Sequence, residues 1–106
     1  SQLAATYLVD RNIDKDARDM QRQVKALQQL RAGDLVAAIE LLESRLDDNL
    51  VLFDPQKPYE GLGERTRLNI QQAINAAKDY RAQYPRSSSR PLVDDMVRHL
   101  FEKTES

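Results

Sequence analysis

The chain of 106 residues is long enough for one domain with a single hydrophobic core. Hydrophobic residues make up 41% of it and charged residues 31%, and its 16 basic and 17 acidic side chains leave a net charge of −1. This composition excludes a disordered tail and gives no overall field that would attract nucleic acid. The absence of cysteine excludes disulfides, thiolate metal ligands and a cysteine nucleophile.

Residues 1–12 contain apolar side chains without a clear period, and we expect an N-terminal extension or the frayed start of a helix there. Because the chain begins at Ser1 and not at a methionine, we expect an N-terminal piece, such as a tag, a signal peptide or an anchor helix, to precede it. No apolar run approaches the roughly 18 residues that cross a bilayer, so we expect no membrane insertion of this segment.

The first regular element is a helix predicted over residues 13–31, which contain neither glycine nor proline. Its apolar residues recur at alternating spacings of four and three, which places them on one helical face: Ile13, Ala17, Met20, Val24 and Leu27. We interpret this face as part of the core. The same spacing is that of a coiled coil over two heptads, so self-association is an alternative.

The oxygen-bearing side chains near the start of this helix alternate as in a calcium-binding EF-hand loop: Asp10, Asn12, Asp14 and Asp16. Lys15 stands where that loop needs glycine, and Gln21 stands where it needs a bidentate glutamate. We therefore interpret the carboxylates as favourable charges at a helix N-terminus, with a calcium-stabilised domain as the alternative.

A turn at Gly33 and Asp34 separates this helix from a second one, predicted over residues 35–46. Gly33 can adopt the left-handed conformation that ends a helix, and Asp34 can cap the next one. The second helix carries its own apolar stripe, and two alanines allow a close approach: Leu35, Ile39, Leu42 and Leu46, with Ala37 and Ala38. The pattern predicts a helical hairpin.

The run Gly33-Asp34-Leu35, followed by Ala38-Ile39, Leu42 and Leu46, resembles the turn and second helix of a tetratricopeptide repeat. Large apolar residues are usual in the first helix of that repeat, where this chain has Arg22, Lys25 and Gln29. One divergent repeat and an unrelated hairpin with a common turn are therefore both open. The resemblance implies a protein that holds partners and does no catalysis.

After the hairpin, residues 50–53 form a short apolar run, which we expect to be an extended segment packed over the open end of the hairpin. Residues 54–63 contain two prolines and two glycines and are predicted to form a surface loop. Loops often carry function, and Tyr59 and Leu62 would be the adhesive side chains of this one. The interpretation that we prefer is that both side chains fold back to plug the core.

Two further helices are predicted, over residues 64–84 and 91–103, joined by a polar linker at 86–90. Pro85 ends the first of them, and Pro91 opens the second. Arginines gather around the linker, where they could meet phosphate or an acidic protein patch, or form a solvated edge: Arg81, Arg86 and Arg90.

No reactive constellation is evident in the sequence. His99 is the only histidine, so a two-histidine metal site is not available, and we expect no serine-histidine-aspartate triad. The paired carboxylates Asp47-Asp48 and Asp94-Asp95 are adjacent, so they point apart on a helix and make no dyad. We expect no enzyme activity, no cofactor and no metal site.

The sequence therefore predicts an all-α fold of about four helices, in a tetratricopeptide-like or irregular antiparallel bundle, with a single domain over residues 13–103. We expect a non-catalytic interaction or scaffold domain that binds another protein or itself, as in a homodimer, and does not bind nucleic acid. A bundle that binds a small apolar ligand and a self-associating structural domain are the alternatives. The candidate interaction surface comprises Tyr59, Leu62, Arg65, Arg67 and Arg81.

Overall fold

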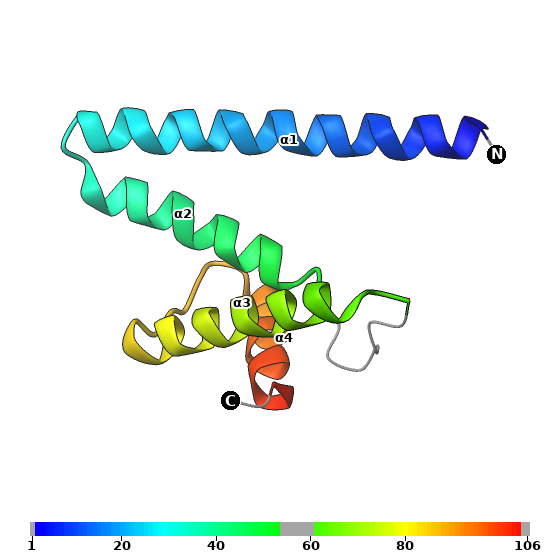
Figure 1. The fold of residues 1–106 in the computed structure, drawn as a ribbon. Helices are drawn as coiled ribbons and strands as arrows, with labels where there is room; N and C mark the ends of the chain where they lie inside the picture. Colours follow the sequence, from blue (N-terminus) through cyan, green and yellow to red (C-terminus); the bar gives the residue numbers. More distant parts are fainter. Residues whose placement is uncertain (1, 54–60, 105–106) are drawn as a thin grey trace. The chain divides into compact units, whose positions relative to one another are not determined.

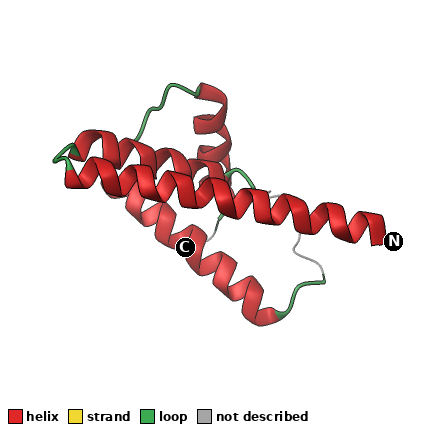
Figure 2. Ribbon diagram, turned by 90° about the horizontal axis from the view of Figure 1, so that it is seen from above, coloured by secondary structure: helices red, strands yellow, loops and turns green. Residues whose placement is uncertain are grey.

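The computed structural model describes residues 2–53 and 61–104, with side chains from residue 13 onward. These residues form four α-helices and no strand (Figures 1 and 2). The helices are α1 (Gln2–Arg31), α2 (Leu35–Leu50), α3 (Glu64–Gln83) and α4 (Pro91–Lys103). The all-α prediction is confirmed, and α4 has the predicted bounds. Among the described residues, no helix contains a stretch long and apolar enough to cross a membrane.

The chain divides into two compact units, Ser1–Ser44 and Arg45–Ser106, where the sequence suggested one domain over 13–103. The first unit contains α1 and the beginning of α2. The second contains the end of α2 together with α3 and α4.

The helix begins at Gln2, which corrects the boundary expected at residue 13 and agrees with the start of a helix, not an extension, among the described residues 2–12. Residues 2–12 lack a regular apolar period, but they also lack glycine and proline, so helix propensity continues the element. This result also overturns the calcium alternative. Residues 10–21 lie inside a continuous helix, whereas an EF-hand needs a loop that wraps around the ion.

The prediction that α2 ends at residue 46 and is followed by an extended segment is also wrong. The helix continues to Leu50, whose side chain is buried in the core of the second unit. The acidic pair Asp47-Asp48 does not break the helix, because both carboxylates form ion pairs with arginines from later in the chain.

The turn between α1 and α2 has the hydrogen bonds of a Schellman motif. Gly33 has φ +82°, and its N–H donates to the Leu30 carbonyl, while the Asp34 N–H donates to the Gln29 carbonyl. The Asp34 side chain then accepts a hydrogen bond from the Ala37 N–H at 3.1 Å, which caps α2. The predicted roles of Gly33 and Asp34 are confirmed.

The apolar core lies in the second unit, where α2, α3 and α4 each contribute buried side chains. Its buried members are Leu50, Ile74, Ala77, Val97 and Leu100, and the half-buried Leu46, Val51, Phe53, Ile70, Val93 and Phe101 pack against them. The large apolar side chains of α3 and α4 are only partly in the core, since Tyr80, Leu92 and Met96 are exposed.

The first unit has no comparable core among its described side chains. Ala26 and Ala38, one on each helix, are its two buried residues. The stripe predicted to be core is instead exposed, with Ile13, Met20, Val24 and Leu27 each 52–62% accessible. The two buried positions of this unit hold small residues, and most of its large apolar side chains are exposed, with Leu41 half-buried.

Replacing Gly33 by alanine should lower the free energy of unfolding by about 1 kcal/mol, because φ +82° places a β-carbon in the left-handed region. An added β-carbon would meet nothing within 4 Å, so the substitution isolates the backbone effect. Gly33→Asn should lose less, since asparagine adopts this conformation more readily. Urea unfolding followed by far-UV circular dichroism would measure both, and equal losses would contradict a conformational cause.

Candidate functional site

The residues of the predicted interaction surface do not all lie together. Tyr59 lies outside the described residues. Leu62 is exposed just before α3, and Arg65 and Arg67 are exposed in its first turns. Arg81 lies four turns further along the same helix, roughly 20 Å away at 1.5 Å per residue, and its side chain is largely buried. The structure thus groups Leu62 with Arg65 and Arg67 and separates Arg81 from them.

Arg81 belongs to an ion-pair cluster centred on Asp47 of α2. The Asp47 carboxylate accepts a hydrogen bond from Arg81 Nη2 at 3.0 Å and one from Arg86 Nε at 2.8 Å. The three side chains are 3%, 9% and 11% accessible. Water therefore screens these charges little. The hydrogen bonds between Asp47 and the two arginines must replace the hydration that all three groups lose on burial.

A second pair joins the same elements closer to solvent. Arg90 Nη1 lies 2.7 Å from Asp48 Oδ1, and these side chains are 41% and 32% accessible. The arginines around the linker were expected to meet phosphate or an acidic patch, or to form a solvated edge. The structure pairs Arg86 and Arg90 with carboxylates of α2 in the same chain, so the acidic patch that they meet is internal.

Asp47 was considered from the sequence only as half of an adjacent carboxylate pair, although a signal for its structural role exists. Asp47 lies three residues before the buried Leu50, on the same side of α2, where a carboxylate needs a charged partner. That signal shows that a partner is required. It does not identify Arg81 and Arg86, which follow by more than thirty positions.

Ser88 of the linker fixes the start of α4. Its hydroxyl donates to Asp94 Oδ1 at 2.6 Å, and its backbone N–H donates to Asp94 Oδ2 at 2.9 Å. The Ser88 hydroxyl bond holds the pKa of the Asp94 carboxyl below its ordinary value of 3.8, with the backbone bond and the charges of Arg86 and Arg90 acting in the same direction and burial opposing them.

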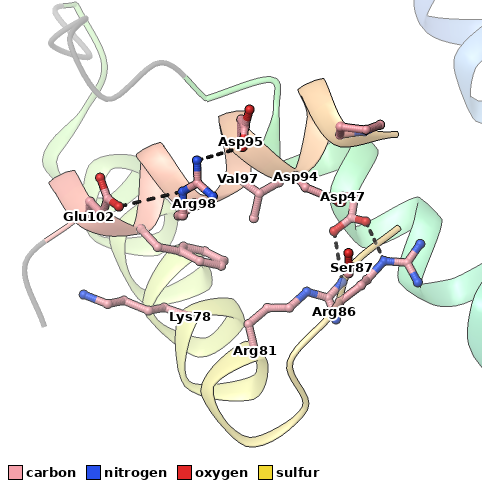
Figure 3. A pocket seen from close by; sticks show the side chains of 12 residues that line it. Asp47, Lys78, Arg81, Arg86, Ser87, Asp94, Asp95, Val97, Arg98 and Glu102 are labelled. Carbon is pink, nitrogen blue, oxygen red and sulfur yellow. Dashed lines mark hydrogen bonds and ion pairs between the residues drawn. The ribbon is translucent and has the colours of Figure 1, made fainter. Parts of the chain in front are cut away.

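An open groove of about 700 Å³ lies in the second unit, and its lining includes Asp47, Arg81, Arg86 and Asp94 (Figure 3). Val97 and Phe101 supply its apolar surface, and charged side chains of both signs surround them. Lys78 Nζ donates to the Thr104 carbonyl at 3.0 Å, and Arg98 lies 2.7 Å from Asp95 and 3.9 Å from Glu102. The groove has the size of a small-ligand cleft, with charges that contact one another.

The described side chains of the groove are not arranged for acid-base chemistry. Asp94 is turned to Ser88 and Asp95 to Arg98, so the adjacent carboxylates do not face each other, as predicted. In the part of the chain that the structure describes, no group of three or more histidines and carboxylates could hold a metal ion. His99 is an exposed residue of α4.

The first unit presents a different surface, which we call the hairpin face. At 100° per residue, the apolar stripe of α1 lies roughly 140° around the helix axis from the buried Ala26. The apolar residues of α2 lie roughly 70° from the buried Ala38, in the same rotational sense. Because the two helices are antiparallel and both stripes are rotated in the same sense around their helix axes, the stripes lie on one side of the hairpin. The hairpin face comprises Ile13, Ala17, Met20, Val24, Leu27, Leu35, Ile39 and Leu42, all exposed.

The chain matches no protein-family model, and comparisons with curated proteins and with solved structures found no significant match. The candidate sites are therefore interpreted from their own geometry and chemistry.

Removing the Asp47 carboxylate should destabilise the second unit strongly. Asp47→Ala leaves two largely buried guanidinium groups without it, so we expect the free energy of unfolding to fall by about 3–5 kcal/mol. Asp48→Ala is the matched control, because its partly exposed pair should contribute no more than about 1 kcal/mol. Urea unfolding monitored by tyrosine fluorescence would compare them, and similar losses would show that burial of the Asp47 cluster is unimportant.

Replacing Ser88 by alanine should raise the Asp94 pKa toward 3.8, since the largest cause of its lowering is removed. A carboxyl with a lowered folded-state pKa stabilises the protein above its ordinary pKa and loses this effect as pH falls through the folded-state value. When the pH is lowered from neutral to below about 4, the free energy of unfolding should therefore fall less in the variant than in the parent. An NMR titration of the carboxyl carbons would measure the pKa, with Ser89→Ala as a control that should leave it unchanged. An unchanged Asp94 pKa in Ser88→Ala would refute this assignment.

Proposed function

We propose that the chain is a non-catalytic helical interaction module, tetratricopeptide-like in its hairpin, that binds another protein or itself through the hairpin face. The observation that carries the proposal is the exposure of this face, in which large apolar side chains of α1 and α2 share one side of the hairpin. Contiguous apolar surface of this kind is typical of a protein interaction site.

The energetics of α1 support a partner. The helix has 30 residues, yet Ala26 is the one buried side chain among those described in it. Helices in proteins gain most of their stability by packing an amphipathic face against other elements. Covering the apolar stripe of α1 would supply that packing, so partner binding and the stability of the helix are expected to be coupled.

The geometry of the turn supports the likeness to a tetratricopeptide repeat. Gly33 ends the first helix, Asp34 caps the second, and the fully buried Ala38 lies where a small residue permits close approach. Such hairpins hold partners through side chains on the surfaces of their helices. The polar residues Arg22 and Lys25 are exposed on α1, which is consistent with a single divergent repeat that has no neighbouring repeat against that side.

The absence of catalysis is part of the proposal. The charged groups that a reaction would need are used in ion pairs that hold the second unit together, above all Asp47 with Arg81 and Arg86. We therefore assign the second unit a structural role. The exposed surface of Leu62, Arg65 and Arg67 would form a second contact region of the same module.

The test is an affinity capture from a lysate of the native host with a tagged chain. We expect a partner, or the untagged chain itself, to be captured by the parent and lost by Val24→Glu/Leu27→Glu, because two carboxylates cannot be buried against an apolar partner. Lys25→Glu changes the net charge by the same two units on another side of α1 and should retain the partner.

A third variant separates the two surfaces. Leu62→Ala/Arg65→Ala alters the loop and the start of α3 and should retain a partner that is bound by the hairpin face. Circular dichroism must first show that each variant keeps its helices. A partner kept by Val24→Glu/Leu27→Glu and lost by Leu62→Ala/Arg65→Ala would place the interaction on the surface predicted from the sequence and contradict a role for the hairpin face.

A further inference from the structure

We infer that the partner is a second copy of this chain, and that the α1 helices of two copies pair antiparallel through their hairpin faces. This inference rests on the proposed function, since it names the partner of the same face. Three observations carry it: the spacing of the stripe, the sizes of its residues, and the charges at its two ends.

The stripe has the spacing of a helix that packs along another helix. Ile13, Ala17, Met20, Val24 and Leu27 follow one another at four, three, four and three residues, and all are exposed. A repeat of 3.5 residues keeps one seam facing a partner with the same repeat. The α1 helix of a second copy has the same repeat, so two copies can pair along this seam without a different protein.

The sizes of the side chains favour the antiparallel orientation. With Met20 of one copy opposite Val24 of the other, Ala17 lies opposite Leu27, so that a small residue meets a large one in two layers of the seam. In the same register Ile13 lies opposite Arg31. A parallel pair in register would place Ala17 against Ala17 and leave a void there, and voids lower stability. It would also place Arg31, the next position of the repeat, against Arg31.

The charges favour the same orientation. Asp14 and Asp16 flank the beginning of the stripe, where Asp14 also forms an exposed ion pair with Arg18 at 3.2 Å, and Arg31 follows its end. Antiparallel pairing brings the acidic end of one copy to the basic end of the other, whereas parallel pairing brings like charges together. The flanks between these ends are neutral and exposed, since Gln21, Gln23 and Gln28 occupy them. Self-pairing therefore meets no repulsion along the seam.

The area of the face is adequate for a dimer. Because Leu35, Ile39 and Leu42 of α2 lie on the same side as the α1 stripe, they add to the surface that a second copy covers. The exposed parts of the apolar side chains amount to something on the order of 600 Å² per copy, which approaches the roughly 800 Å² per partner of a standard interface. The polar rim would supply the remainder.

The first test is sedimentation velocity on the purified 106-residue chain over a micromolar to submillimolar range. We expect a monomer–dimer equilibrium in the parent, a dissociation constant raised by roughly a hundredfold or more in Val24→Glu/Leu27→Glu, and little change in Lys25→Glu. A parent that is monomeric throughout the range would overturn the inference, as would a dimer that Val24→Glu/Leu27→Glu leaves intact.

The second test measures orientation by disulfide formation, which the absence of native cysteine makes simple. Chains carrying Met20→Cys and Val24→Cys are given different tags, mixed and oxidised. Antiparallel pairing predicts disulfides mainly between the two different variants, because residues 20 and 24 lie opposite each other. Disulfides mainly between identical variants would establish a parallel pair and overturn the antiparallel arrangement.

The outcomes distinguish this inference from the proposed function. A monomeric parent whose hairpin face still captures a different protein would preserve the interaction module and refute self-pairing. A monomeric parent in which Val24→Glu/Leu27→Glu lowers the thermal stability of the chain would show that the face is covered within one molecule, and both proposals would then fail.

Discussion

The buried carboxylate of Asp47 holds three parts of the second unit together: the end of α2, the helix α3 and the linker that leads into α4. Arg81 comes from α3 and Arg86 from the linker, and both donate to the two oxygens of one side chain. A charge with so little access to water is stable only where opposite charges and hydrogen bonds replace its hydration. The geometry of these elements is therefore constrained by one residue as well as by apolar contact.

This constraint has consequences for the rest of the unit. Because Arg86 is held by Asp47 and Arg90 by Asp48, the linker is fixed at both ends, and Ser88 between them can bind Asp94 at the start of α4. The core residues Val97 and Leu100 are then supplied by a helix whose first turn is fixed. The groove beside this cluster follows from the same arrangement.

The first unit is built on the opposite principle. Its turn is specified by backbone hydrogen bonds at Gly33 and Asp34, and its covered positions are alanines, while its large apolar residues face outward. Such a unit gains little free energy from apolar burial within itself, and under the proposed function the cover of the hairpin face would add to its stability. The apolar core of the described residues thus lies in the second unit, while the first unit leaves most of its large apolar side chains exposed.

Much of the secondary structure could be predicted because its signals are local. Pro85 and Pro91 bracket the linker, Gly33 and Asp34 make the turn, and the helical periods of α3 and α4 are clear in the sequence. The candidate surface was less predictable. Leu62 is exposed, although the sequence favoured a side chain folded back into the core. Arg81 is ion-paired with Asp47, and no local pattern relates residues so far apart in the chain.

The sequence by itself determined the helices, the turn and the apolar stripes, because propensity, capping and period act over a few residues. The tertiary structure alone decided which stripes are covered. An amphipathic period requires that a face be buried, but it does not say whether the cover comes from the same chain, and the stripe of α1 was wrongly interpreted as core for this reason. It also decided that Asp47 is buried, since burial of a charge depends on partners that only the folded chain brings together.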